Sequence, residues 1–246
     1  MNFNMIKNLL DSLNMDATIS EVYIFYNWVI VRSIRYAMST LLRGMPGLLE
    51  PQGMNTYMGD IIGKSVLDIA DEYLKSQETL KRAVGMATLK SLLPVPKCFL
   101  EGNAIDHYRE FARVHPTCFI GHFAEAESWR AEGDPVNIIE LFPRPGDIHW
   151  NDSHKILAEA ELVLMTGLTI VNGTFDEAVR RTPRAKYRVI MGPTVPLSPV
   201  LFDYGVDQIG GTIIQDPEKS IHYCSLGGGS IANAPAGALR KINLVK

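Results

Sequence analysis

Residues 162–194 read LVLMTGLTIVNGTFDEAVRRTPRAKYRVIMGPT, and this stretch contains the pattern that decides the fold. It opens with the apolar run Leu162–Met165 and closes with a second run, Arg188–Met191. Between them, a capping-box pattern at Thr174 begins a helical segment that ends before Pro183. Short apolar runs separated by a helix are typical of parallel strands joined by a crossover. The stretch therefore predicts a strand–helix–strand unit.

The same alternation extends over the second half of the chain. Further apolar runs lie at Thr117–Ile120, Val136–Leu141 and Val206–Ile209, with helical segments between them. Alternating strands and helices favour a parallel sheet with helices on both faces. The fold class predicted for the chain is α/β, with a Rossmann-like parallel-sheet domain over residues 101–246.

The first hundred residues have a different pattern. Residues 21–33 are rich in Val, Ile, Tyr and Phe around a turn near Tyr26-Asn27, which predicts a β-hairpin. Two helices follow, one capped by Ser65 and a longer one that starts after Ser76. Strands followed by helices indicate a small α+β domain over residues 1–100.

Composition limits the partners to be expected. The 246 residues are 46% hydrophobic and carry a formal net charge of −3 without a long basic run, which argues against non-specific nucleic-acid binding. Three scattered cysteines without a CxxC pair suit the reducing cytoplasm. The apolar stretch Val22–Val31 is shorter than the ~20 residues that cross a bilayer. We expect a cytoplasmic protein with a small-molecule partner, no nucleic acid and no membrane; the oligomeric state, including a homo-oligomer, stays open.

The loops that follow the predicted strands form the candidate ligand site. In open parallel sheets, ligands bind at the carboxyl ends of strands, and small or hydroxylated loop residues expose N–H groups that suit an anion. Turns and helix caps need the same residue types, so the sequence alone leaves a purely structural role open. The candidate ligand-binding residues are Gly121, His122, Phe123, Glu140, Thr166, Gly167, Thr169, Asn172, Thr174, Gly192, Pro193 and Thr194.

His122 and Glu140 are the candidates for metal binding or acid–base chemistry. His122 follows a glycine at a strand end, where an imidazole could ligate a metal or transfer a proton. Glu140 ends an apolar run, where a carboxylate needs a partner, a cation or solvent. The chain lacks GxGxxG, so NAD or FAD bound in the usual way is not expected. The cofactor is unknown, and a divalent heavy metal or a metal chelate remains a candidate.

The C-terminal motifs carry a family resemblance. The runs Thr166–Thr174 and Met191–Phe202, followed by Gly205 and then Gly210-Gly211, resemble the putative heavy-metal chelation domain family. That resemblance implies an enolase-N-terminal-like domain joined to a Rossmann-like domain, with a site in the cleft between them and a role in handling heavy metals. By motif, the matching positions are Thr166, Gly167, Thr169, Asn172, Thr174, Gly192, Pro193, Thr194 and Pro196.

Three functional hypotheses remain from the sequence. The leading one is a binding protein or enzyme for a small anionic or metal-chelating molecule in the interdomain cleft. The alternative is a nucleotide- or S-adenosylmethionine-dependent enzyme, in which Glu140 would hold a ribose at the end of the second strand. The third is a non-catalytic interaction protein of metal homeostasis. The sequence fixes neither the ligand nor whether a reaction follows binding.

Overall fold

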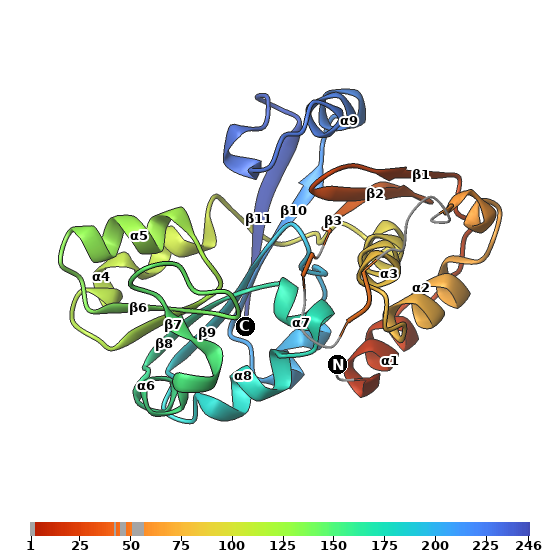
Figure 1. Cartoon of the computed structure of the whole chain (residues 1–246). Helices are drawn as coiled ribbons and strands as arrows, with labels where there is room; N and C mark the ends of the chain where they lie inside the picture. The colour runs from red at the N-terminus through yellow and green to blue at the C-terminus, as the bar shows by residue number, and fades with distance from the viewer. Residues whose placement is uncertain (1–2, 42, 45–47, 51–56) are drawn as a thin grey trace.

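Two β-sheets organise the chain in the computed structural model, which describes residues 3–41, 43–44, 48–50 and 57–246 (Figure 1). One sheet has three strands near the N-terminus, and the other has eight strands that take up most of the second half. Helices pack on both sheets, so the α/β class is confirmed. None of the helices in the described parts of the chain is both long enough and apolar enough to cross a membrane.

The small sheet contains the predicted hairpin. β1 (Glu21–Ile24) and β2 (Trp28–Arg32) pair antiparallel across the expected turn, and β3 (Tyr36–Thr40), which was not predicted, pairs with β2. Trp28 and the three residues after it are all buried, because both faces of the sheet are covered. One face packs on α2 (Val66–Leu74) and α3 (Thr79–Leu92), and the other on α9 (Pro217–Ser225).

Helix α3 lies between the two sheets and is buried on nearly every side. Its Val84 and Ala87 join the core of the small sheet, while Met86 and Leu89 join the core on one face of the large sheet. Helix α1 (Phe3–Asp11) also adds apolar side chains to that larger core. The larger hydrophobic core therefore contains residues from both sides of residue 100. The division of the chain into two domains at that residue stays a prediction.

The large sheet has the order β4-β11-β10-β9-β8-β5-β6-β7. From β10 to β7 all neighbours are parallel, as predicted. Its strands are β4 (Leu100–Glu101), β5 (Thr117–Ile120), β6 (Val136–Glu140), β7 (Ile148–His149), β8 (Leu162–Thr166), β9 (Tyr187–Gly192), β10 (Gln208–Ile214) and β11 (Leu239–Val245).

The prediction of a parallel sheet is wrong at one edge, where β11 runs antiparallel to β10 and β4 antiparallel to β11. A further parallel strand would need a helix packed across the sheet. Helix α9 instead packs Cys224 against Trp28 and Met38 of the small sheet. The chain then returns directly beside β10, and the two strands rise together toward α9 in Figure 1.

Side chains alternate between two cores on the large sheet. Phe119 and Leu164 face the layer of α5 (Ala124–Ala131), and Cys118 and Val163 face the opposite core. The remaining helices are η2 (Gly59–Ile61), η3 (Ala104–Tyr108), α4 (Arg109–Ala112), η4 (Trp150–Asp152), α6 (His154–Glu159), α7 (Leu168–Asn172), α8 (Phe175–Arg181), η5 (Pro199–Tyr204) and η6 (Ile231–Asn233).

The predicted capping signal at Ser65 is confirmed, whereas those at Thr174 and Ser76 differ in detail. Ser65 accepts a hydrogen bond from the Asp68 N–H (3.1 Å) at the start of α2. The capping box at Thr174 is wrong in detail: α8 starts there, but the Thr174 hydroxyl donates to Asn172 Oδ1 (2.8 Å) rather than capping the helix. The long helix α3 starts at Thr79, because the Ser76 side chain instead accepts from the Glu78 N–H (3.0 Å).

The order of the parallel strands creates a topological switch point. In chain order β5 comes first, β6 lies on one side of it, and β8 with β9 and β10 lies on the other. Ligands in sheets of this kind bind beyond the carboxyl ends of the two strands where the order reverses. Here those strands are β5 and β8.

Candidate functional site

Two glycines turn the chain sharply at the carboxyl edge of the large sheet. Gly121 follows β5 with φ +109°, and Gly192 ends β9 with φ +119°, a region that L side chains rarely adopt. The Gly121 N–H donates to the Ile139 carbonyl (3.0 Å), which ties the turn to β6. A Cβ on Gly192 would meet open space. The backbone is thus exposed to a hollow at this edge.

Two adjoining cavities lie at that edge. Cavity 1, of about 280 Å³, extends from Trp28 and Thr40 of the small sheet to the end of β9 and the middle of β10 and β11. Cavity 2, of about 180 Å³, lies over the ends of β5, β6 and β8. His122, Phe123 and Thr166 line both cavities, so the two share a wall at the switch point.

Most of the sequence-predicted site residues line one of these cavities. Those around cavity 2 are Gly121, His122, Phe123, Glu140, Thr166, Thr169, Asn172 and Thr174. Those around cavity 1 are His122, Phe123, Thr166, Gly192 and Pro193.

Gly167 and Thr194 line neither cavity and have packing roles. A Cβ on Gly167 would lie 2.5 Å from Val195 Cγ2, so the glycine allows close approach of two loops. Thr194 is buried; its hydroxyl accepts from the Thr40 N–H (3.1 Å) and donates to Thr40 Oγ1 (3.0 Å). Thr194 therefore fastens the loop after β9 to the small sheet.

Lys90, which was not among the residues predicted from the sequence, makes a second connection at the same place. The Lys90 ammonium group, buried in α3, donates to the Met38 carbonyl (2.7 Å) and to the Pro193 carbonyl. Burial lowers the pKa of Lys90 well below its ordinary value of 10.5, and the nearby Arg35 lowers it further. A lysine among the buried residues near the end of α3 was the available sequence signal.

The polar side of cavity 1 comes from β11, which the sequence analysis did not predict. Lys241 and Asn243 are two residues apart and so lie on the same face of the strand, opposite Thr212 and Gly210 of β10. Among the described residues, no carboxylate pairs with the Lys241 ammonium group.

Asn243 has an unpaired polar atom in this cavity wall. Its side chain is 1% exposed, and its Nδ2 donates to the Gly102 carbonyl (3.0 Å) and the Leu100 carbonyl (3.4 Å). These two acceptors fix the amide orientation, because only the NH₂ group can donate. The buried Oδ1 is left without a hydrogen-bond partner in the structure.

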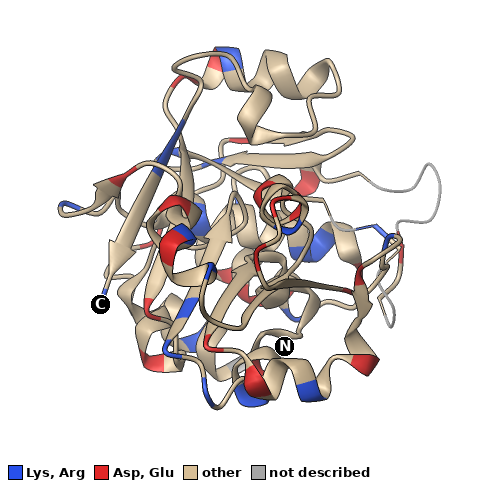
Figure 2. Ribbon diagram, turned by 90° about the vertical axis from the view of Figure 1, so that its left-hand side faces the viewer, with Lys and Arg blue, Asp and Glu red and all other residues tan. Residues whose placement is uncertain are grey.

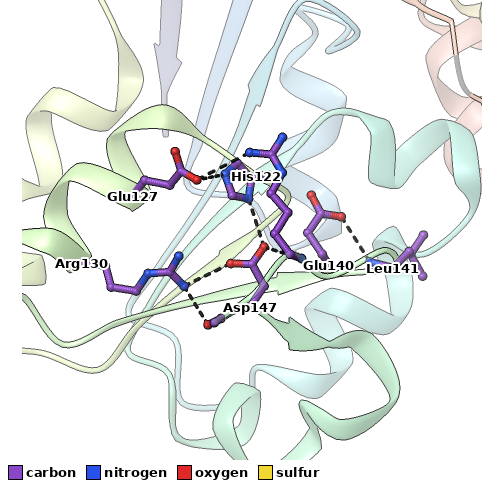
Figure 3. Close-up of polar contacts among 8 residues, drawn as sticks. His122, Glu127, Arg130, Glu140, Leu141 and Asp147 are labelled. Atoms are coloured by element: carbon purple, nitrogen blue, oxygen red, sulfur yellow. Dashed lines mark hydrogen bonds and ion pairs between the residues drawn. The ribbon is translucent and has the colours of Figure 1, made fainter.

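His122 is held between two carboxylates, as Figure 3 shows. Its Nε2 lies 2.6 Å from Glu127 Oε1, and its Nδ1 lies 3.1 Å from Asp147 Oδ2. Arg130 pairs with the other oxygen of Asp147 (3.1 Å), and Arg144 lies 3.6 Å from Glu127. Both ring nitrogens are occupied, so His122 could ligate a metal only by giving up one of these contacts.

Asp147 is the buried centre of this network. Its side chain is fully buried, and burial raises its pKa. Hydrogen bonds from the Arg144 N–H, Arg130 and His122 oppose this effect and bring the pKa below the ordinary 3.8. Asp147 therefore stays ionised and fixes the His122 ring.

Glu140 faces cavity 2 at the end of β6. Its carboxylate accepts from the Leu141 N–H (3.2 Å), a contact also drawn in Figure 3. Burial raises the pKa of Glu140 above its ordinary value, although N–H groups of Leu141 and His122 work in the opposite direction. A partly desolvated carboxyl group is thus available at the switch point.

Protein side chains do not gather into a metal centre in the part of the chain that the structure describes. No group of three or more His, Cys, Asp or Glu residues there could hold a metal ion. Cys118 lies in the core, where burial raises its pKa to about 12. His122 and Glu140, the sequence-predicted metal candidates, thus belong to no such group.

These features define a mixed α/β protein with two adjoining cavities at the switch point of its larger sheet. The chain belongs to the DUF364 family, whose profile matches residues 103–243 and whose description is "Putative heavy-metal chelation". The DUF4213 profile, with the same description, matches residues 6–93. The family resemblance seen in the sequence is confirmed.

Two solved structures have the same fold. A DUF364 protein of unknown function from Desulfitobacterium hafniense DCB-2 is 19% identical, with a TM-score of 0.85 over 99% of this chain and 98% of that one. Another from Pyrococcus horikoshii is 20% identical, with a TM-score of 0.75 over the full length of both chains. At this identity, the likeness shows the fold alone.

A similar curated protein is an uncharacterized protein of Methanocaldococcus jannaschii. It is 32% identical over 79 residues, a match that covers 32% of this chain and 30% of that protein. The match thus spans less than a third of that relative's length.

Proposed function

We propose that the protein binds a small anionic, metal-chelating molecule in cavity 1, and that it takes up heavy metal as a complex of that molecule. The family description supports a role in metal handling. Because the described side chains form no metal centre of their own, a chelating molecule would supply most of the donor atoms. The proposal follows the sequence hypothesis of a site between a Rossmann-like domain and an enolase-N-terminal-like domain.

The Lys241 ammonium group in the wall of cavity 1 is the observation that carries this proposal, because it offers a positive charge to an anionic guest. Asn243, two residues later on the same strand, has a buried oxygen without a donor, which would accept from an N–H or O–H group of a guest that has one.

The proposal can be tested by calorimetric titration of the full chain with nickel chloride, with dipicolinate, and with the nickel–dipicolinate complex. We expect dipicolinate or its complex to bind more tightly than nickel chloride. Lys241→Met should weaken that binding about tenfold or more, because a charged hydrogen bond is lost. Lys155→Met is the matched control, since Lys155 is exposed on α6 and lines neither cavity. The proposal would be contradicted if nickel chloride bound as tightly as dipicolinate and its complex. It would also be contradicted if Lys241→Met bound dipicolinate as tightly as the parent protein does.

A further inference from the structure

Cavity 2 contains an acidic residue at a position with chemical meaning in sheets of this kind. Glu140 is the last residue of β6, the second parallel strand, next to the switch point between β5 and β8. It follows the Gly121 turn by about 20 residues, the separation at which an acidic side chain of dinucleotide-binding domains hydrogen-bonds a ribose hydroxyl. The topology thus presents a carboxyl group where a sugar would lie.

The other polar groups of cavity 2 complement hydroxyl groups. Asn172 Oδ1 accepts from both the N–H (3.0 Å) and the hydroxyl (2.8 Å) of Thr174, which leaves the Asn172 NH₂ group to donate to a guest. The Thr169 hydroxyl donates to the Thr166 carbonyl (2.8 Å), so its oxygen can still accept. Glu140 adds a carboxylate acceptor. Neutral donors and acceptors around one carboxylate suit a polyhydroxyl group.

Size and wall composition also suit a sugar ring. The volume of about 180 Å³ is many times the roughly 10–15 Å³ that one water needs, so a small polar group of several heavy atoms fits there. Trp150, Ile139 and Leu168 form apolar walls, against which the C–H faces of a sugar can pack. Cavity 2 continues past His122 and Thr166 into cavity 1, so a larger group attached to the sugar could extend into cavity 1.

The turn after β5 disfavours a pyrophosphate at this site. It has the single glycine Gly121, where close approach of a pyrophosphate needs a glycine-rich turn. The first turn of the following helix carries Glu125 and Glu127, and their charges would repel phosphate. A guest that binds at this edge would therefore present its sugar without a diphosphate.

We propose that cavity 2 binds the vicinal diol of a ribonucleoside that lacks a diphosphate, with Glu140 accepting from the ribose hydroxyls and Asn172 donating to them. This inference is independent of the proposed function, because Glu140 and Asn172 line cavity 2 but not cavity 1. A free sugar has the same diol, so the test separates the two sources.

The test is calorimetric titration of the full chain with adenosine, 2′-deoxyadenosine and ribose. We expect adenosine to bind at least tenfold more tightly than 2′-deoxyadenosine, which lacks one hydroxyl of the diol, and ribose to bind more weakly than adenosine. Glu140→Gln and Asn172→Asp should each bring the affinity ratio of the two nucleosides close to one. Asn172→Asp keeps the oxygen that holds Thr174 and replaces only the donor.

A matched control and a folding check keep these outcomes distinct. Glu159→Gln alters an exposed carboxylate of α6 that lines neither cavity and should leave the nucleoside ratio unchanged. Glu140→Gln should be at least as stable as the parent protein at neutral pH, because it removes a carboxylate whose ionised form burial disfavours. Equal binding of both nucleosides, binding of neither, or an unchanged ratio in both cavity 2 variants would overturn the proposal. Binding of ribose without adenosine would overturn the nucleoside assignment.

The diol site in cavity 2 and the proposed function of cavity 1 can fail independently of each other. Loss of dipicolinate binding with an intact nucleoside ratio would remove only the cavity 1 proposal. The reverse result would remove only the diol site.

Discussion

Gly121 packs tightly against Thr166 at the switch point, because a Cβ on Gly121 would lie only 2.8 Å from Thr166 Cγ2. The two residues follow or end neighbouring parallel strands, β5 and β8, and both line cavity 2. The absence of a side chain at Gly121 therefore lets the ends of β5 and β8 approach closely beside cavity 2.

Gly121→Ala should destabilise the protein by about 2–4 kcal/mol, the combined effect of a positive φ and overpacking. Thr166→Ser removes the methyl group that would clash, so the double variant should recover the packing part but not the backbone part. Urea unfolding of the two single variants and the double variant measures this. If Gly121→Ala costs the same free energy of unfolding in the parent protein as in the Thr166→Ser background, the contact with Thr166 is unimportant.

Thr194→Val should lower the free energy of unfolding by about 1–3 kcal/mol, because it leaves the Thr40 N–H without its acceptor. Thr194→Ser keeps the hydroxyl group and is the matched control. Chemical denaturation provides the measurement. If Thr194→Ser loses more stability than Thr194→Val, which keeps the methyl group, methyl packing rather than the hydrogen bond joins this loop to the small sheet.

Lys90→Met should change how stability depends on pH. The pKa of Lys90 is lowered in the folded protein, so below 10.5 the unfolded chain binds more protons at this position. Lys90 therefore costs stability at neutral pH, and this cost shrinks as the pH rises toward 10.5. Unfolding free energies measured between neutral pH and about pH 10 should rise more steeply in the parent protein than in Lys90→Met. Parallel curves would show that Lys90 stays charged in the folded state.

Asp147→Asn should lower stability by about 2–3 kcal/mol at neutral pH, since the buried carboxylate accepts charged hydrogen bonds from Arg130 and His122. Its pKa is lowered on folding, so this contribution is present above the ordinary value of 3.8 and is lost as the pH falls below it. Equilibrium unfolding over a pH series tests both statements.

Glu127→Gln is the control for Asp147, because it removes the other carboxylate that contacts His122. That side chain is 50% exposed, so its loss should cost less than about 1 kcal/mol. A larger loss from Glu127→Gln than from Asp147→Asn would mean that the exposed contact, not the buried one, holds the imidazole.

The candidate site could be predicted in part from the sequence. Gly121, Glu140 and Thr166 were placed at the carboxyl edge of the sheet, because apolar runs locate strand ends and a parallel sheet brings those ends to one edge. Thr194 shows the limit of that reasoning. It follows a strand like the others, yet its hydroxyl group bonds to Thr40, a partner 154 positions away in sequence.

Local elements could be predicted from the sequence: the hairpin of residues 21–33, the strands at Thr117–Ile120 and Leu162–Met165, and the cap at Ser65. These depend on side-chain periodicity and on hydrogen bonds between near neighbours, which a short window of sequence contains. Tertiary structure decided that β11 runs antiparallel and that Asn243 faces cavity 1, since these features depend on where α9 packs and on contacts such as that between Asn243 and Gly102. Burial and long-range pairing arise only when distant segments meet, so no local pattern encodes them.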